Sequence, residues 1–179
     1  MINRPPAALP LGAEWLNALP QGAGWTPPAA FAAQPVREVH FRTVQGRTSG
    51  QSTQIVEWLY ASVSVGQLGQ GTATNAQVRT WVQQEVGRPA DDAGHIIGNN
   101  QGGLGTVQWN IFPQSSNFNR GVFSRDVERM IHDAASLGQV QIWFRFNYTN
   151  AAEPGRPTNF HFFILFSDGA TMNSDLLNP

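Results

Sequence analysis

The residue types that could perform acid, base or metal chemistry concentrate in residues 91–128. This window contains four short motifs, Asp91-Asp92-Ala93-Gly94-His95-Ile96-Ile97-Gly98, Gly102-Gly103, Asn110-Ile111-Phe112-Pro113-Gln114 and Asn117-Phe118-Asn119-Arg120-Gly121. Taken singly, each motif is more typical of a turn, a cap or a loop than of a catalytic site. A histidine is neutral enough near pH 7 to accept a proton, since its unperturbed pKa is about 6.5. Amide and carboxylate oxygens are ligands of the kind that Mg²⁺ takes.

The composition excludes several other chemistries. The chain has 179 residues, no cysteine, and 11 basic residues that are all arginine. It therefore has no thiolate nucleophile, no Cys-ligated zinc site, no Schiff-base lysine and no P-loop lysine. The formal net charge is -1, so phosphate binding would depend on a few placed arginines rather than on the overall charge.

Hydrophobic periodicity predicts the elements that position this window. Strands are expected at residues 39–44, 55–65, 107–112, 140–148 and 160–166, the last of them apolar on both faces and therefore central in a sheet. Helices are expected from a cap at Thr74 or Asn75 to Val86, and from Arg120 to about Ala135. Residues 88–106 are expected to form a loop. The sequence thus predicts an α+β domain with a mainly antiparallel sheet flanked by helices.

The first 35 residues differ in composition from the rest. Prolines are spread through residues 1–35 among alanine and glycine, a density that disfavours both helix interiors and central strands. This segment is either a linker or an arm laid over the domain formed by residues 36–179. The arm is favoured, because Trp15, Leu16, Trp25 and Phe31 could dock on the domain.

The order of the four motifs resembles that of the DNA/RNA non-specific endonucleases, which are ββα-metal (His-Me finger) nucleases. The residues that match are Asp-x-Gly-His-Ile-Ile-Gly, Gly-Gly, Asn-x-x-Pro-Gln and Asn-Arg-Gly, all within residues 91–128. The predicted strands and helix around them are compatible with the rest of that fold. The resemblance implies a ββα-metal catalytic unit, phosphodiester hydrolysis and a divalent cofactor, Mg²⁺ or Mn²⁺.

The resemblance also implies roles for individual residues. His95 corresponds to the general base that deprotonates water, and Asn119 to the main protein ligand of the divalent ion. Asn110 would orient groups around the base and the metal, and Asp92 would orient the loop or hydrogen-bond near the base. A base, a cation and positive charge against the phosphate are what phosphodiester hydrolysis requires.

The chain departs from the family at two positions. The family commonly has arginine where this chain has Ala93, and it places a glutamate on the helix where this chain has Val127. Glu128 comes one residue later, about 100° further round an α-helix, so it can join the site only if the helix start is locally rewound. Arg120 and Arg88 are the arginines expected to contact phosphate, and a solvated surface position is the alternative for both.

These features predict a metal-dependent endonuclease with little sequence specificity that acts on DNA, RNA or both. The first alternative is a catalytically inactive nuclease-like domain that binds nucleic acid or a protein. The second is a β-rich binding module whose Asp-x-Gly-His loop is only structural.

A role as a toxin or secreted nuclease is compatible with the proline-rich N-terminal segment, and a toxin would have a dedicated inhibitor protein. Because no apolar run could span a bilayer and no signal-peptide profile is present, no membrane partner is expected and localisation stays open.

Overall fold

The structure, a computed structural model, describes residues 3–5, 9–18, 20–118 and 126–179. Its largest element is a six-stranded sheet in the order β1-β2-β3-β6-β7-β8, in which every neighbouring pair is antiparallel. The strands are β1 (Gly24–Trp25), β2 (Val36–Gln45), β3 (Ser52–Val63), β6 (Val140–Asn147), β7 (Asn159–Leu165) and β8 (Thr171–Leu177). The predicted α+β class with a mainly antiparallel sheet is therefore confirmed.

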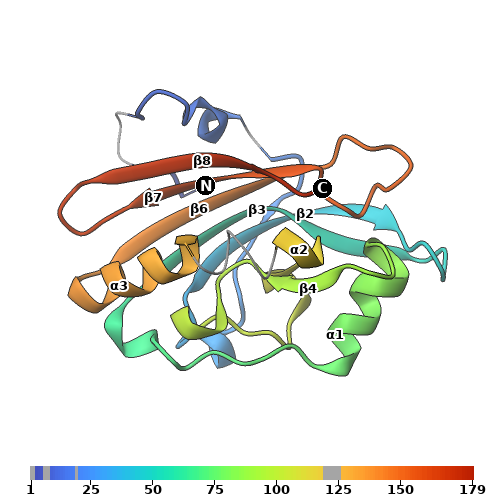
Figure 1. The fold of residues 1–179 in the computed structure, drawn as a ribbon, viewed down its shortest axis with the longest axis horizontal. Helices are drawn as coiled ribbons and strands as arrows, with labels where there is room; N and C mark the ends of the chain where they lie inside the picture. The colour runs from blue at the N-terminus through green and yellow to red at the C-terminus, as the bar shows by residue number, and fades with distance from the viewer. Residues whose placement is uncertain (1–2, 6–8, 19, 119–125) are drawn as a thin grey trace.

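A smaller two-stranded sheet, β4 (Asp92–His95) and β5 (Ile111–Gln114), lies with the helices on one side of the large sheet (Figure 1). The helices are α1 (Ala76–Trp81), which continues as the π-helical η4 (Val82–Val86), α2 (Ser116–Phe118) and α3 (Arg129–Leu137). Short 3-10 turns are η1 (Glu14–Asn17), η2 (Ala29–Phe31), η3 (Val65–Gln67), η5 (Asn99–Gln101) and η6 (Gln108–Asn110). Within the described residues, no helix combines the length and hydrophobicity of a membrane span.

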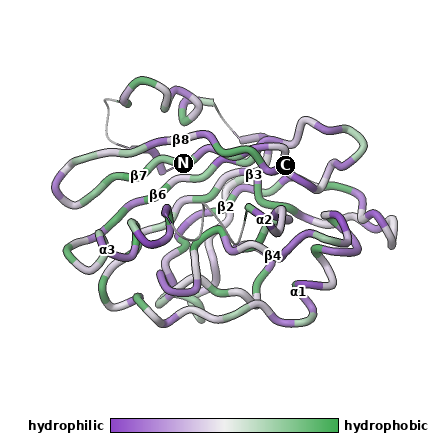
Figure 2. The backbone as a smooth tube through the Cα atoms, viewed as in Figure 1, coloured by the Kyte–Doolittle hydropathy of each residue, from purple (hydrophilic) through white to green (hydrophobic). Residues whose placement is uncertain are grey.

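Both faces of the large sheet are buried. Along β6, Val140, Ile142, Phe144 and Phe146 enter the main core on the helix side. Trp143 instead points to the opposite face, where it joins a second cluster that contains Leu16 of the N-terminal segment. Hydrophobic stretches along β6 and β7 are visible in the hydropathy of the backbone tube (Figure 2). The alternation that predicts this strand thus places one set of side chains against the helices and the other under the N-terminal segment.

The described part of the N-terminal segment is docked on the sheet. Leu16 is 3% exposed, and Trp15 stacks on His161 with ring centroids 5.3 Å apart. Further along, Trp25 and Phe31 both contact Trp109 on the side of the sheet that carries the helices. The described residues of this segment therefore contact the sheet, and its division from residues 36–179 as a separate arm stays a prediction.

Three strands were not expected from the sequence: the two-residue β1 in the proline-rich segment, β4 and β8. Strand β8 pairs with β7 at the edge of the sheet, and all of its residues are exposed or only partly buried, so it lacks the hydrophobic alternation that identifies a half-buried strand. Strand β4 lies within residues 88–106, which were predicted to form a loop. The sequence did not indicate it because the strand has only four residues and contains a glycine. Strand β7 lies between β6 and β8, as expected of its two-sided apolar sequence.

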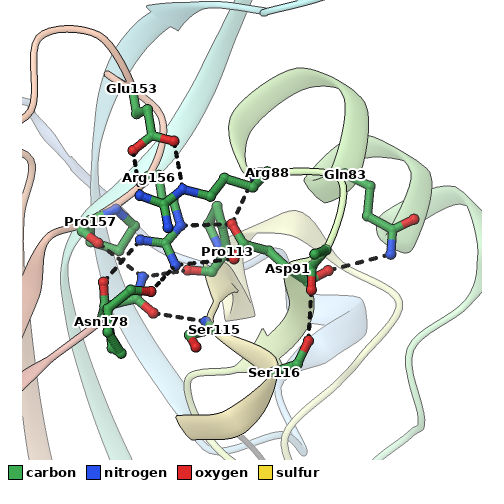
Figure 3. Close-up of polar contacts among 12 residues, drawn as sticks. Gln83, Arg88, Asp91, Pro113, Ser115, Ser116, Glu153, Arg156, Pro157 and Asn178 are labelled. Carbon is green, nitrogen blue, oxygen red and sulfur yellow. Dashed lines mark hydrogen bonds and ion pairs between the residues drawn. The ribbon is translucent and has the colours of Figure 1, made fainter.

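A buried ion pair attaches the small sheet to the C-terminal residues (Figure 3). Arg156 donates from Nε to Asp91 Oδ2 at 2.8 Å and from a terminal nitrogen to Asp91 Oδ1 at 3.1 Å, and both side chains are 4% exposed. The same guanidinium donates to the carbonyls of Asn178 and Pro179. Asn178 in turn donates to the carbonyls of Pro113 and Pro157. The start of β4 and the end of β5 are thereby tied to one buried polar network.

A single asparagine holds the loop that follows β4. Asn110 is fully buried; its Oδ1 accepts a hydrogen bond from Ile97 N at 2.9 Å, and its Nδ2 donates to the carbonyls of Ile97 and Leu104. Gly103 packs so tightly against the Ile97 carbonyl that any Cβ there would overlap it. The backbone of residues 97–104 is therefore held by the amide group of Asn110 and by a close approach that only glycine allows.

Removing the Arg156 guanidinium should destabilise the fold strongly. In Arg156→Met, Asp91 stays buried without its counter-charge, so the free energy of unfolding should fall by about 3–5 kcal/mol. Urea denaturation followed by tryptophan fluorescence measures the change. The matched control is Arg88→Met, because the Arg88–Glu153 pair is 49% and 30% exposed and such a pair contributes up to about 1 kcal/mol. Equal losses in the two variants would contradict this account.

Asn110→Ala should also destabilise the protein, because it leaves the buried amide and carbonyl of Ile97 without side-chain partners. We expect a loss of at least about 2 kcal/mol, since each unsatisfied buried group costs about 1–3 kcal/mol. Thermal or urea unfolding measures it. Asn100→Ala, at an exposed neighbouring asparagine, should change stability by less than about 0.5 kcal/mol, and a comparable loss there would rule out the proposed clamp.

Candidate active site

His95 lies at the end of β4, opposite Ile111 of β5. Its Nε2 is 2.9 Å from the carbonyl oxygen of Thr72. A carbonyl can only accept a hydrogen bond, so Nε2 must carry the proton, and the lone pair of the neutral ring must then be on Nδ1. Among the described residues, Nδ1 has no hydrogen-bond partner. The structure thus fixes the tautomer and leaves one basic nitrogen available.

The surroundings of His95 favour its neutral form. Burial lowers the pKa of the imidazole below its ordinary value, because the charged form loses hydration, and the hydrogen bond to Thr72 opposes this only partly. The ring is partly exposed rather than sealed in the core. His95 is therefore predominantly neutral at pH 7, which is the state that a general base requires.

The Thr72 carbonyl is itself positioned by the loop opposite. It accepts a hydrogen bond from Gly105 N at 3.0 Å, and the Thr72 hydroxyl accepts from the same amide at 2.9 Å. Thr72 and Leu104 also form an isolated parallel bridge. The sequence analysis missed this partner of His95, because a backbone carbonyl has no residue-type signal.

Asn110 and Asp92 occupy different environments in the hairpin. Asn110 has no exposed surface, and the described contacts of its side chain are with backbone groups of the loop, so it can affect His95 only through the loop. The carbonyl of Asn110 also accepts from Ile96 N, one residue after the histidine. Asp92 is the first residue of β4 and pairs with Gln114. The structure therefore places both in the hairpin that carries His95, and their proposed roles remain predictions.

The helix carries its glutamate at residue 128 instead of residue 127, and the structure shows where each of these two residues lies. Val127, at the position where the resemblance predicts glutamate, is 6% exposed and belongs to the main core. Residues 126–128 are wound as π-helix before α3 begins. The Glu128 carboxylate lies over the loop that follows His95, with Oε1 2.7 Å from the point where a Cβ on Gly98 would be. The structure therefore brings Glu128, and not residue 127, to the His95 loop.

Of the two arginines predicted to contact phosphate, the structure describes Arg88 and not Arg120. Arg88 donates from Nε and a terminal nitrogen to the two carboxylate oxygens of Glu153, at 2.7 and 2.9 Å (Figure 3). This pairing raises the pKa of Arg88 and lowers that of Glu153. The structure thus gives Arg88 a protein partner, and phosphate contact would have to compete with Glu153. Asn119 and Arg120 lie outside the described residues.

Two glutamines have buried amide atoms without partners. Gln114, the last residue of the Asn-x-x-Pro-Gln motif, is fully buried, and neither its Oε1 nor its Nε2 has a hydrogen-bond partner within the described part of the chain. Its amide lies directly against Gly94, next to His95. Gln101 is 2% exposed, and its Oε1 is likewise without a donor. Unpaired buried amides are uncommon in folded proteins, so both residues are candidates for the site. The motif could have indicated Gln114, whereas nothing in the sequence singles out Gln101.

The oxygen donors near Gly98 suit a hard divalent cation. Among the described residues, no three His, Asp or Glu side chains converge on one point. A Cβ on Gly98 would, however, meet both Gln101 Oε1 and Glu128 Oε1. Amide and carboxylate oxygens suit Mg²⁺ or Mn²⁺, and Mg²⁺ binds with few protein ligands because it retains water. The residues present therefore fit such an ion.

Comparison with known proteins supports the same fold. No protein-family model matches the chain. Over 103 residues the chain is 39% identical to "Probable deoxyribonuclease RhsA" of Dickeya dadantii (strain 3937), a match that covers 57% of this chain and 7% of that protein. The chain therefore spans only a small part of its curated relative.

Solved structures are similar over most of the chain. EndoG, from "Crystal structure of the EndoG/EndoGI complex: Mechanism of EndoG inhibition", superposes with a TM-score of 0.54 at 13% identity, covering 87% of this chain and 82% of that one. "Structure of Sda1 nuclease with bound zinc ion" superposes with a TM-score of 0.56 at 11% identity, covering 88% and 84%. The resemblance to ββα-metal nucleases that the motifs predicted is thus confirmed at the level of the fold, and the chain has the α+β fold of the EndoG and Sda1 nucleases.

Proposed function

We propose that this chain is a metal-dependent endonuclease that hydrolyses phosphodiester bonds with little sequence specificity. The observation that carries the proposal is His95, a neutral imidazole with a fixed tautomer and an available Nδ1, placed on a hairpin within a nuclease fold. The partial identity to a protein named as a probable deoxyribonuclease supports the same activity and favours DNA as a substrate. RNA is included because the motif order is that of sugar-non-specific enzymes.

In the proposed mechanism, His95 Nδ1 takes a proton from the water that attacks the phosphorus. The Thr72 carbonyl keeps Nε2 protonated and stabilises the imidazolium that forms, because it continues to accept the hydrogen bond from Nε2. The clamp by Asn110 on residues 97–104 holds the loop that follows the base. Asp92 and Gln114, which face each other in the hairpin, would support the loop and the base.

A divalent ion, when bound, would neutralise charge developing on the phosphate and assist the leaving oxygen. We propose Asn119 as its main protein ligand and Glu128, whose carboxylate lies over the loop that follows His95, as a second group near the ion. Mg²⁺ or Mn²⁺ fits these oxygen donors. Arg120, and Arg88 after release from Glu153, are the proposed phosphate contacts.

We also propose that the nuclease acts outside the cell that makes it, as a secreted enzyme or a delivered toxin. The relative is named as an Rhs protein of which this chain matches only a small part, which is the arrangement expected of a nuclease unit carried by a much larger protein. A toxin of this kind would need an inhibitor protein, and EndoG has been solved in complex with the inhibitor EndoGI.

Replacing the proposed base should abolish cleavage without unfolding the protein. His95→Ala should lower the rate of plasmid nicking by about 10²–10⁴-fold, the range supplied by a positioned general base. Supercoiled plasmid and a long RNA are incubated with the protein in Mg²⁺ or Mn²⁺, with and without EDTA. The wild-type protein should nick at least one substrate, and EDTA should stop the reaction.

The matched control is His132→Ala, because His132 is a partly exposed histidine on α3. It should retain the wild-type rate. A wild-type protein that binds nucleic acid but never nicks it would support the inactive nuclease-like domain instead. Nicking that persists in His95→Ala would exclude His95 as the base.

The pH profile should reflect the lowered pKa of His95. The base must be neutral, so kcat/KM should be constant above the pKa of the histidine and fall as pH drops through it. Because burial lowers this pKa, the midpoint should lie below the ordinary value of about 6.5. Cleavage of a fluorescent oligonucleotide at saturating metal measures the profile, and a midpoint above pH 6.5 would contradict the assignment.

A further inference from the structure

We infer that Gln101 supplies an oxygen ligand to a divalent cation that it shares with Glu128, at the turn that follows His95. This inference rests on the proposed function and extends it to a residue outside the recognised motifs. The observation behind it is a buried amide oxygen that lacks a donor and lies beside a carboxylate.

The orientation of the Gln101 amide is fixed by its surroundings. Gln101 Nε2 donates to the carbonyl oxygen of Glu128 at 2.7 Å. That carbonyl can only accept, so the NH₂ group must face it, and the Oε1 atom must face the other way. A rotated amide would place two acceptor oxygens in contact. The unpaired Oε1 is therefore a consequence of the fold and not of an interchangeable amide assignment.

The unpaired oxygen has another oxygen as its neighbour. Gln101 Oε1 and Glu128 Oε1 both lie within 2.7 Å of the position that a Cβ of Gly98 would take. The glycine thus allows an amide oxygen and a carboxylate oxygen to approach the same point. A carboxylate oxygen cannot donate a hydrogen bond, so the Gln101 oxygen gains no donor from this neighbour.

A cation explains this arrangement better than packing does. Gln101 is 2% exposed, and a buried acceptor without a partner costs about 1–3 kcal/mol. An apolar side chain of similar length would avoid that cost if the position served only the core. A hard divalent ion satisfies an amide oxygen and a carboxylate oxygen at the same time. Any other partner of Glu128 leaves the Gln101 oxygen unsatisfied.

The test compares two substitutions that differ in whether the side chain still ends in an oxygen ligand. Gln101→Met and Gln101→Glu both remove the donor to the Glu128 carbonyl, but only Gln101→Glu keeps an oxygen at the end of the side chain. Binding of Mn²⁺ to the full chain, without nucleic acid, is measured by isothermal titration calorimetry and by the electron paramagnetic resonance signal of free Mn²⁺. Thermal midpoints without metal establish that each variant is folded.

We expect Gln101→Met to weaken Mn²⁺ binding by about 10-fold or more, and Gln101→Glu to bind at least as tightly as the wild type. Gly98→Ala, whose Cβ would overlap Gln101 Oε1, should weaken binding without removing any ligand. Asn100→Ala, at the exposed adjacent residue, should leave the affinity unchanged. Equal affinities for the wild type, Gln101→Met and Gly98→Ala would overturn the inference, as would equally weak binding by Gln101→Met and Gln101→Glu.

The nuclease assay separates this inference from the proposed function. If the wild type nicks plasmid in an EDTA-sensitive and His95-dependent way while Gln101→Met binds Mn²⁺ normally, the function stands and the role of Gln101 is wrong. If Mn²⁺ binds through Gln101 but the wild type cleaves nothing, the cation site stands and the nuclease proposal fails. A wild-type chain that binds no Mn²⁺ and cleaves nothing contradicts both.

Discussion

The buried pair between Arg156 and Asp91 is the constraint on which the position of the candidate site depends. Both side chains are 4% exposed, so separating them would leave each buried charge without its counter-charge. Asp91 immediately precedes β4, and its Oδ2 also accepts from the amide of Arg88. Arg156 belongs to the connection between β6 and β7. The pair therefore fixes where the small hairpin begins relative to the large sheet, and His95 follows at the far end of the same four-residue strand.

From that fixed start, contacts with backbone groups shape the site. A backbone carbonyl sets the tautomer of His95, the amide group of Asn110 holds backbone atoms on either side of the loop, and Gly103 admits the Ile97 carbonyl at a distance no other residue tolerates. Hydrogen bonds of this kind depend on local conformation and only weakly on the identities of exposed side chains. Backbone contacts of this kind are compatible with a fold that is shared with the EndoG and Sda1 structures at only 11–13% identity.

The dependence of the site on backbone contacts also limits how much of the structure could be predicted from the sequence. Alternation predicted β6, and the apolar run predicted β7, because their side chains are sorted between two buried faces. Strand β8 is an exposed edge and β4 is a four-residue strand with a glycine, so neither has a hydrophobic period to detect. Among the site residues, His95 and Asn110 are identifiable because their residue types recur at set motif positions. The Thr72 carbonyl could not be predicted, since any residue carries one, and Gln101 required the position of its amide.

The segment before α3 shows how a one-residue change in spacing can be accommodated. In a regular α-helix, residues 127 and 128 would point about 100° apart, so moving the glutamate by one position would turn it from the site toward another face. A π-helical turn has a wider loop of backbone than an α-helical turn and accommodates one extra residue. Residues 126–128 have this winding, Val127 packs in the core, and the Glu128 carboxylate lies over Gly98. The π-helical winding thus occurs at the position where the sequence departs from the family pattern, and a role of Glu128 in the site stays a prediction.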